Sequence, residues 1–192
     1  MERDAEATRR RLLLAARDEF SHYGVAGARV DRIAAAARAS KAQIYHYFGS
    51  KKALFDAVIA TVIAEGVDDL PTEPEDLPQY AGRLHDWYRE RPWVQRLAMW
   101  QRLERGPDDC GLLGAIITAH AGMAGSIARA QDGGLTSGRF SAEELSALVV
   151  HLSTLWSTAP PADDPTAHET RSAKRQRDMI VRAVAALMVP PH

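Results

Sequence analysis

Apolar side chains recur every three to four positions along almost the whole chain. This spacing gathers side chains on one face of an α-helix, and no segment alternates with the two-residue period of a β-strand. In the first predicted helix, residues 6–23, a stripe is formed by Leu13, Ala16 and Phe20, and Gly24 supplies a candidate left-handed stop. The pattern therefore predicts an all-α fold.

Two short helices are predicted next, at residues 30–37 and 41–48, with only three residues between them. Two short helices joined by a tight turn form a helix-turn-helix. Ser40 can cap the second helix, and the side chain of Gln43 can bond back to the Ser40 backbone in a capping box. Phe48 is the residue of this helix that we expect to face the core.

Longer helices follow. Ser50 is a candidate N-cap for a helix over residues 51–68, and the proline-rich, acidic segment 70–78 is expected to be a loop. The last two helices each begin with a capping box. The remaining predicted helices are 78–90, 93–105, 112–132, 141–157 (opened by Ser141 and Glu144) and 166–188 (opened by Thr166 and Glu169). The chain should therefore contain about nine helices.

Charge divides this all-helical chain into two parts. Of its 192 residues 46% are hydrophobic, which is enough for a sizeable core. The net charge of -1 conceals an asymmetry, because residues 1–52 carry 11 Lys and Arg against 6 Asp and Glu, whereas residues 53–192 carry 13 against 19. A basic first segment suggests contact with a polyanion. We expect a three-helix head with the helix-turn-helix at 1–52 and a helical body at 53–192.

Several functional classes find no support in the sequence. Cys110 is the only cysteine, so neither an intrachain disulfide nor a thiolate metal cluster can form. The charged start and the lack of a long apolar run predict a soluble cytoplasmic protein with no membrane contact. Motifs of serine hydrolases, nucleotide-binding loops and zinc peptidases are absent. We therefore expect neither an enzyme nor a cofactor.

Residues 8–55 resemble the head of the TetR family of transcription regulators. The most specific part is Tyr45-x-Tyr47-Phe48-x-Ser50-Lys51-x-x-Leu54 after a Ser-capped short helix. The match covers about a quarter of the chain. It implies a homodimeric DNA-binding regulator, most often a repressor, whose body binds a small molecule.

The predicted DNA contacts centre on the second short helix. Such a helix can lie in the major groove with its first turn against base edges, while nearby polar side chains hold phosphates. Gln43 in that turn can pair with adenine, or be occupied by its capping box instead. The resemblance implies backbone-positioning roles for Tyr45, Tyr47 and Lys51. The full predicted set is Arg29, Ser40, Lys41, Gln43, Tyr45, His46, Tyr47 and Lys51.

Two positions depart from the family pattern. The turn position that often holds glycine is Arg38, so either the turn is built differently or it tolerates a left-handed residue at a cost of about 1 kcal/mol. The residue before the first short helix, usually Ser or Thr, is Arg29. A hydroxyl cap is therefore missing there, although Arg29 could contact a phosphate itself.

Aromatic and methionine side chains gather in the predicted body, as suits an apolar ligand pocket between helices; ordinary core packing is the alternative. The predicted ligand-binding residues are Trp87, Met99, Trp100, His120, Met123 and Trp156. No metal site is expected, because no helix carries a close pair among the histidines of the body, which are His85, His120, His151 and His168.

The last two helices carry apolar stripes that exceed what the two helices need to pack on each other. The resemblance implies that they pair across a twofold axis as a four-helix bundle, and burial against the body is the competing interpretation. The predicted dimer residues are Leu145, Leu148, Leu152, Trp156, Ile180, Val184 and Leu187. The expected partners are double-stranded DNA, a small apolar or aromatic effector and a second copy of the chain. The alternatives are a helical small-molecule carrier or hydrolase with a vestigial head, and a ligand-independent architectural DNA binder.

Overall fold

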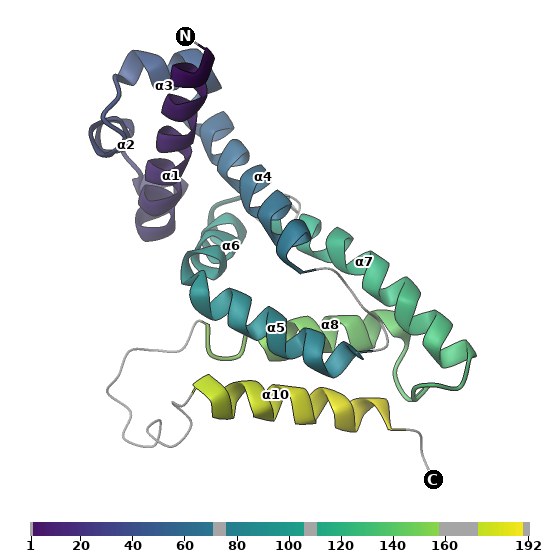
Figure 1. The fold of residues 1–192 in the computed structure, drawn as a ribbon. Coiled ribbons are helices and arrows are strands. Elements are labelled where there is room, and N and C mark those ends of the chain that lie inside the picture. The colour runs from purple at the N-terminus through teal and green to yellow at the C-terminus, as the bar shows by residue number, and fades with distance from the viewer. Residues whose placement is uncertain (1, 71–75, 106–110, 158–172, 190–192) are drawn as a thin grey trace. The chain divides into compact units, whose positions relative to one another are not determined.

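The computed structural model describes residues 2–70, 76–105, 111–157 and 173–189, and for residues 111–121 it describes the helix alone. All regular elements in these ranges are helices, which confirms the all-α prediction. Nine helices are present in the described ranges (Figure 1): α1 Glu2–Gly27, α2 Val30–Ala36, α3 Lys41–Phe48, α4 Lys51–Asp69, α5 Leu77–Glu90, α6 Pro92–Arg105, α7 Gly111–Asp132, α8 Ala142–Ser153 and α10 Ala173–Met188.

Three helix ends differ clearly from the prediction. α1 begins at Glu2 and not at residue 6. α1 breaks at Gly24 (φ 69°, ψ -178°) as expected, but a further helical turn runs on to Gly27. α8 ends at Ser153 and not at residue 157, because the next residues form turns with hydrogen bonds to the third residue before them, such as Ser157 N–H to Thr154 O at 3.1 Å. The capping box of Thr166 and Glu169 lies outside the described residues.

The helices form two compact units. The first contains α1 to α4 as far as Gly66, together with α6 from Trp93 and the start of α7; the second contains α5, the rest of α7, α8 and α10. This division differs from the boundary expected between residues 52 and 53. α4 joins the head because the rings of Phe20 and Phe55 meet edge to face at 5.2 Å. α6 joins it through Trp93, whose ring lies 4.7 Å from the Arg17 guanidinium.

The core of the first unit is built from the predicted apolar stripes. Fully burying one such side chain contributes about 1.5–3 kcal/mol. Phe48, however, is only half-buried, with the Arg9 guanidinium 5.6 Å from its ring centre. Phe48 thus lies on the same helix face as the buried Ile44, one turn earlier, but keeps part of its surface exposed, whereas Tyr45 is exposed. The described side chains of this unit with no exposed surface are Leu12, Ala16, Phe20, Ile33, Ile44, Leu54, Phe55 and Leu97.

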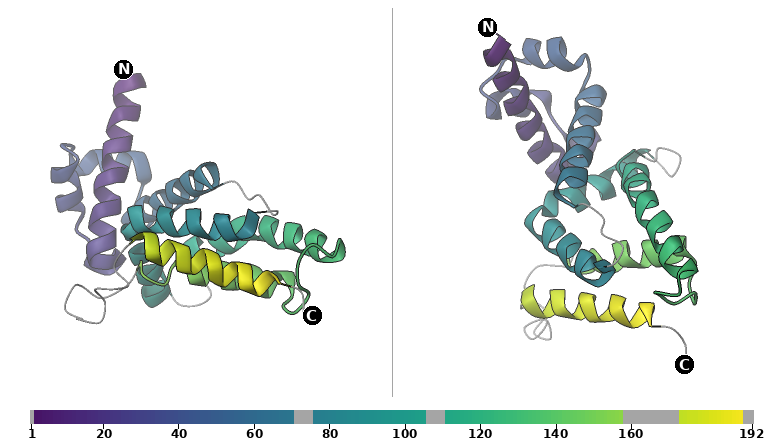
Figure 2. Two further views of the ribbon diagram at one scale, coloured as in Figure 1. Left: turned by 60° about the horizontal axis from the view of Figure 1, so that its bottom comes forward. Right: turned by 45° about the vertical axis from the view of Figure 1, so that its right-hand side comes forward.

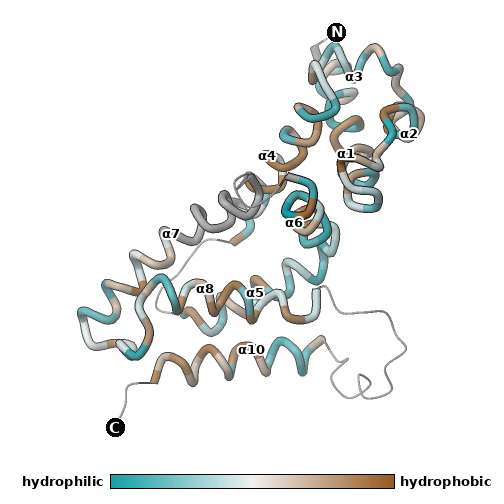
Figure 3. The backbone as a smooth tube through the Cα atoms, turned by 180° about the vertical axis from the view of Figure 1, so that it is seen from behind, coloured by the Kyte–Doolittle hydropathy of each residue, from teal (hydrophilic) through white to brown (hydrophobic). Residues whose placement is uncertain are grey.

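In the second unit, α10 lies alongside α5 (Figure 1, Figure 2). Gly82 allows the approach, because a Cβ at this position would be 2.9 Å from Cγ2 of Val181. Nε of Arg177 donates to Asp86 Oδ2 at 3.0 Å and ties the hydrophilic end of α10 to α5, while the other end of α10 is hydrophobic (Figure 3). Ser153 of α8 donates from Oγ to the Ala81 carbonyl of α5 at 3.1 Å. α5 therefore packs against both α8 and α10.

Within the described residues no helix combines the length and the apolar character needed to span a membrane.

Candidate nucleic-acid interface

The start of α3 is fixed by a capping box. The backbone N–H of Gln43 donates to Ser40 Oγ at 3.2 Å, and Gln43 Oε1 accepts from the Ser40 backbone N–H at 2.8 Å. This confirms the predicted cap, which is worth roughly 1 kcal/mol. The cap also occupies the side-chain oxygen of Gln43.

The turn before α3 is built around a left-handed arginine. Arg38 has φ 51°, so the turn keeps the conformation that glycine usually supplies and the strain is tolerated. The Ala39 N–H donates to the Ala34 carbonyl at 2.9 Å. Arg11 of α1 donates from Nε to the Ala37 carbonyl at 3.1 Å and supports the same turn. Nothing in the local sequence of the turn indicated this contact.

A buried carboxylate binds the backbone at the start of α2, where the hydroxyl cap is missing. Glu19 Oε1 accepts from the Arg29 backbone N–H and from Arg32 Nε, each at 2.8 Å. Burial by itself would raise the pKa of Glu19, but the hydrogen bonds from Arg32 and Arg29 outweigh it, so that the pKa lies below its ordinary value. The Arg32 guanidinium also lies 4.2 Å from the Tyr23 ring centre. The Arg29 side chain makes no cap hydrogen bond.

α3 presents most of its side chains to solvent. Only Ile44 is buried, whereas Lys41, Gln43, Tyr45 and His46 are exposed. Nζ of Lys41 lies 3.1 Å from Oδ1 of Asp31 in α2. Exposed pairs of this kind contribute little to stability, so the lysine can exchange its partner for DNA.

Lys51 stabilises the head itself. Its ammonium donates to the carbonyls of Ala28 at 3.1 Å and Ala26 at 3.4 Å, at the chain segment between α1 and α2. The Ala53 N–H donates to Ser50 Oγ at 3.0 Å, which confirms Ser50 as the N-cap of α4. If Lys51 contacts a phosphate, its ammonium group must therefore divide its hydrogen bonds between the phosphate and these carbonyls.

α6 docks on the end of α1 in the same unit. Glu104 Oε2 accepts from the backbone N–H groups of Val25 at 2.8 Å and Ala26 at 3.0 Å, which explains why a helical turn continues beyond Gly24. A Cβ on Gly24 would lie 2.7 Å from a ring carbon of Trp100. The positive φ of Gly24 and this close approach both require glycine.

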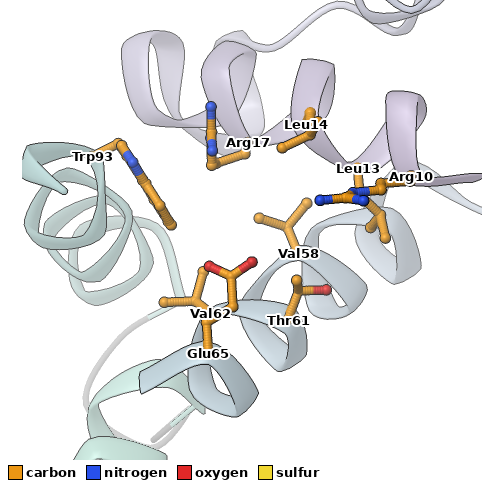
Figure 4. A pocket seen from close by; sticks show the side chains of 9 residues that line it. All are labelled: Arg10, Leu13, Leu14, Arg17, Val58, Thr61, Val62, Glu65 and Trp93. Atoms are coloured by element: carbon orange, nitrogen blue, oxygen red, sulfur yellow. The ribbon is translucent and has the colours of Figure 1, made fainter. Parts of the chain in front are cut away.

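A small cleft lies between α1, α4 and α6 (Figure 4). Leu13, Val58 and Val62 form part of its apolar wall. Trp93 of α6 stands at one side, with the guanidinium of Arg17 stacked on it. The cleft lies where the middle of α1 faces α4 and the start of α6.

The predicted ligand-binding residues fall in different units. Trp87 and Met123 are buried in the second unit, and Trp156 is half-buried there. Met99 and Trp100 belong to the first unit, where Met99 is 52% exposed. The side chain of His120 lies outside the described part of the chain. A shared pocket of all six residues stays a prediction.

The predicted dimer residues divide by exposure. Three are already buried within the chain, where they pack α8 and α10 in the second unit: Leu145, Ile180 and Val184, none more than 1% exposed. Four keep part of their surface exposed: Leu148, Leu152, Trp156 and Leu187. Leu155 and Met179, on or just beyond the same helices, are 53% and 38% exposed. A pairing surface would rest on the exposed residues.

α3 is a short capped helix whose polar side chains face solvent, and a tight turn joins it to the preceding short helix, α2. This arrangement defines a helix-turn-helix DNA-binding protein. Two family matches cover most of the chain. Residues 12–58 match the family described as "Bacterial regulatory proteins, tetR family", and residues 76–185 match "Tetracyclin repressor-like, C-terminal domain". The chain belongs to the TetR family, as residues 8–55 indicated.

Its curated relatives are transcription regulators. The repressor SCO4008 of Streptomyces coelicolor is 42% identical over 104 residues, which are 54% of each chain. RutR of Escherichia coli K12 is 31% identical over 111 residues, 55% of this chain and 52% of RutR. The match thus spans about half the length of these relatives.

Solved structures extend the likeness to nearly the whole chain. SCO4942 of Streptomyces coelicolor, a proposed transcriptional regulator, superposes with a TM-score of 0.82 at 35% identity, over 96% of this chain and 99% of that one. GusR of Salmonella enterica has a TM-score of 0.69 at 21% identity, over 94% and 95% of the two chains, and supports the fold alone.

Proposed function

We propose that this chain is a sequence-specific transcriptional repressor that binds an inverted-repeat operator as a homodimer and is released by a small apolar or aromatic molecule. The observation that carries the proposal is α3, which is capped at Ser40, anchored by Ile44 and open to solvent along the face that carries Lys41 and Gln43. Because its proposed partner is chromosomal DNA, we place it in the cytoplasm.

The geometry of Gln43 refines how it would read a base. Its Oε1 accepts from the Ser40 backbone N–H, which leaves one lone pair of this oxygen and both N–H donors of the amide for DNA. Bidentate pairing with adenine needs both the oxygen and the nitrogen, so the oxygen would be shared between adenine and the cap. With the cap intact, Gln43 fits a base edge that presents acceptors, such as the N7 and O6 of guanine.

We expect the flanking side chains to contact phosphates. Arg29 is exposed and free of a capping role, and Tyr45 and Lys41 are exposed on α3. Such contacts hold the register of the protein on DNA and release counterions, so binding should weaken steeply with salt. Two heads in a dimer would read half-sites about 34–36 Å apart.

The response to a ligand can be transmitted by α4, because hydrogen bonds hold both ends of this helix. At its first turn, Lys51 bonds the carbonyls of Ala26 and Ala28 in the head. At its last residue, Asp69 Oδ2 accepts from Nε1 of Trp87 at 3.0 Å and from Nη2 of Arg91 at 2.9 Å. A ligand that displaces Trp87 would therefore bias the helix that carries the head's contacts.

The test starts from operator selection with random duplexes and continues with fluorescence anisotropy on the selected sequence. Gln43→Ala should lose discrimination at particular base pairs, each worth roughly 1–3 kcal/mol. Arg29→Ala should weaken binding to all sequences alike and reduce the salt slope by about 1. Arg139→Ala, the same charge change at an exposed position of the other unit, is the matched control. Failure to select any sequence, or equal effects of Arg29→Ala and Arg139→Ala, would contradict the proposal.

A further inference from the structure

His85 of α5 is a buried histidine that the DNA-binding function does not use. It is 1% exposed, and its Nδ1 lies 3.2 Å from the backbone carbonyl oxygen of Ser153. A carbonyl oxygen can only accept, so Nδ1 carries the proton of the neutral ring. Ser153 is itself fixed, because its Oγ lies 2.8 Å from the Val149 carbonyl oxygen and 3.1 Å from that of Ala81, and its single proton is shared between them. This contact sets the orientation of the imidazole.

The other ring nitrogen has no partner. Nε2 of His85 is the one buried side-chain nitrogen or oxygen that lacks a hydrogen bond within the described part of the chain. Buried polar atoms in proteins are nearly always paired, so an unpaired one calls for an explanation. With the proton on Nδ1, Nε2 presents a lone pair, and the missing partner must be a hydrogen-bond donor.

The described contacts of His85 are with uncharged groups, namely the Ser153 carbonyl and an aromatic ring. The ring of Trp156 stands edge-on to the imidazole, with ring centres 6.0 Å apart, and Trp156 is half-buried in the turn after α8. Tyr88, one turn along α5, is buried deeply enough that desolvation raises the pKa of its hydroxyl. The nearest carboxylate along α5, Asp86, is engaged by Arg177 of α10. This setting disfavours a charged ligand, because a charge would be desolvated without a counter-charge.

We propose that Nε2 of His85 accepts a hydrogen bond from the hydroxyl or N–H group of a small, uncharged aromatic ligand whose ring packs against Trp156. The inference rests on the ligand response proposed above and names the chemistry of the effector. Trp156 contacts the imidazole from the turn at the end of α8 and is itself only half-buried. The ligand enters beside it.

The first experiment measures the NMR resonance of His85 Nε2 directly. The full chain, labelled with ¹⁵N at histidine, is titrated with phenol and, in parallel, with anisole, which has the same ring but no donor. The His85 Nε2 resonance should be that of an unprotonated nitrogen and should move saturably with phenol. Anisole should bind about tenfold more weakly, the ratio expected for one hydrogen bond. His151 is the matched control, because its Nδ1 bonds the Ala147 carbonyl at 2.8 Å while its ring is exposed.

Three results would overturn the proposal. The first is a protonated Nε2 in His85, and the second is an Nε2 resonance that indicates a hydrogen bond before any ligand is added, as a permanently bound water would give. The third is an equal response to phenol and to anisole. His85→Phe should abolish the phenol-induced thermal shift and His151→Phe should preserve it. If His85→Phe does not fold, the titration of the unmodified chain decides. DNA binding is measured separately without phenol, so a chain that binds DNA but shows no Nε2 response contradicts only this inference.

Discussion

Replacing Gly24 by alanine tests how α6 docks on the end of α1. Gly24 combines φ 69° with ψ -178°, a region that only glycine occupies readily, and an added Cβ would lie 2.7 Å from the Trp100 ring. The backbone strain costs about 1–3 kcal/mol. The steric overlap adds about 1–3 kcal/mol, because the ring or the helix must move.

Gly49→Ala is the control that separates these two costs. Gly49 also has a positive φ, 77°, but a Cβ there would meet nothing within 4 Å. Gly24→Ala should therefore be the more destabilising variant in urea and thermal unfolding, with a steric cost of about 1–3 kcal/mol, or roughly 2–12 °C in Tm for a chain of this size, added to its backbone strain. Trp100→Leu combined with Gly24→Ala should recover part of that cost, because the added Cβ would also meet the carboxylate of Glu104. If Gly24→Ala is no more destabilising than Gly49→Ala, Trp100 does not pack on Gly24 as described.

Two further predictions follow from the ion pair of the head and from the exposed apolar residues of the body. Because the folded-state pKa of Glu19 lies below its ordinary value of 4.5, its stabilising contribution is complete above about pH 4.5 and is lost as the pH falls through the folded pKa. Glu19→Gln should therefore be less stable than the unmodified chain at neutral pH and lose less stability between pH 5 and 3, as measured by urea midpoints; parallel curves for the two proteins would refute the role of the carboxylate. Leu155→Arg should convert a dimer to a monomer in light scattering at micromolar concentration, whereas Leu103→Arg, at a position 74% exposed on α6, should not. A monomeric unmodified chain would contradict the proposed pairing.

The sequence by itself determined most of the helices and the starts that are fixed by local caps. The capping boxes of Ser40 with Gln43 and of Ser141 with Glu144 lie where the pattern places them, because a cap joins residues three positions apart. The recurrence of apolar residues likewise predicted α4 from Lys51 to within one residue of its end at Asp69. Local interactions of this kind are encoded in adjacent residues, so they can be read without the fold.

Only the tertiary structure decided which partners the polar groups of the site take. Glu104 caps amides 78 and 79 positions before it, and Lys51 bonds carbonyls 23 and 25 positions before it. The sequence offered Lys51 as a phosphate contact and gave Glu104 no role. Such contacts depend on how separate helices pack, which no local pattern encodes.

The same limit applies to His85 and to the apolar stripes of the body. Helical spacing ruled out a close histidine pair, but the unpaired Nε2 of His85 appears only once α8 places the Ser153 carbonyl against Nδ1. Val184 and Leu187 belong to one stripe in the sequence, yet Val184 is fully buried and Leu187 keeps exposed surface. Periodicity identifies the face of a helix, whereas the packing of the neighbouring helices determines how much of that face is covered.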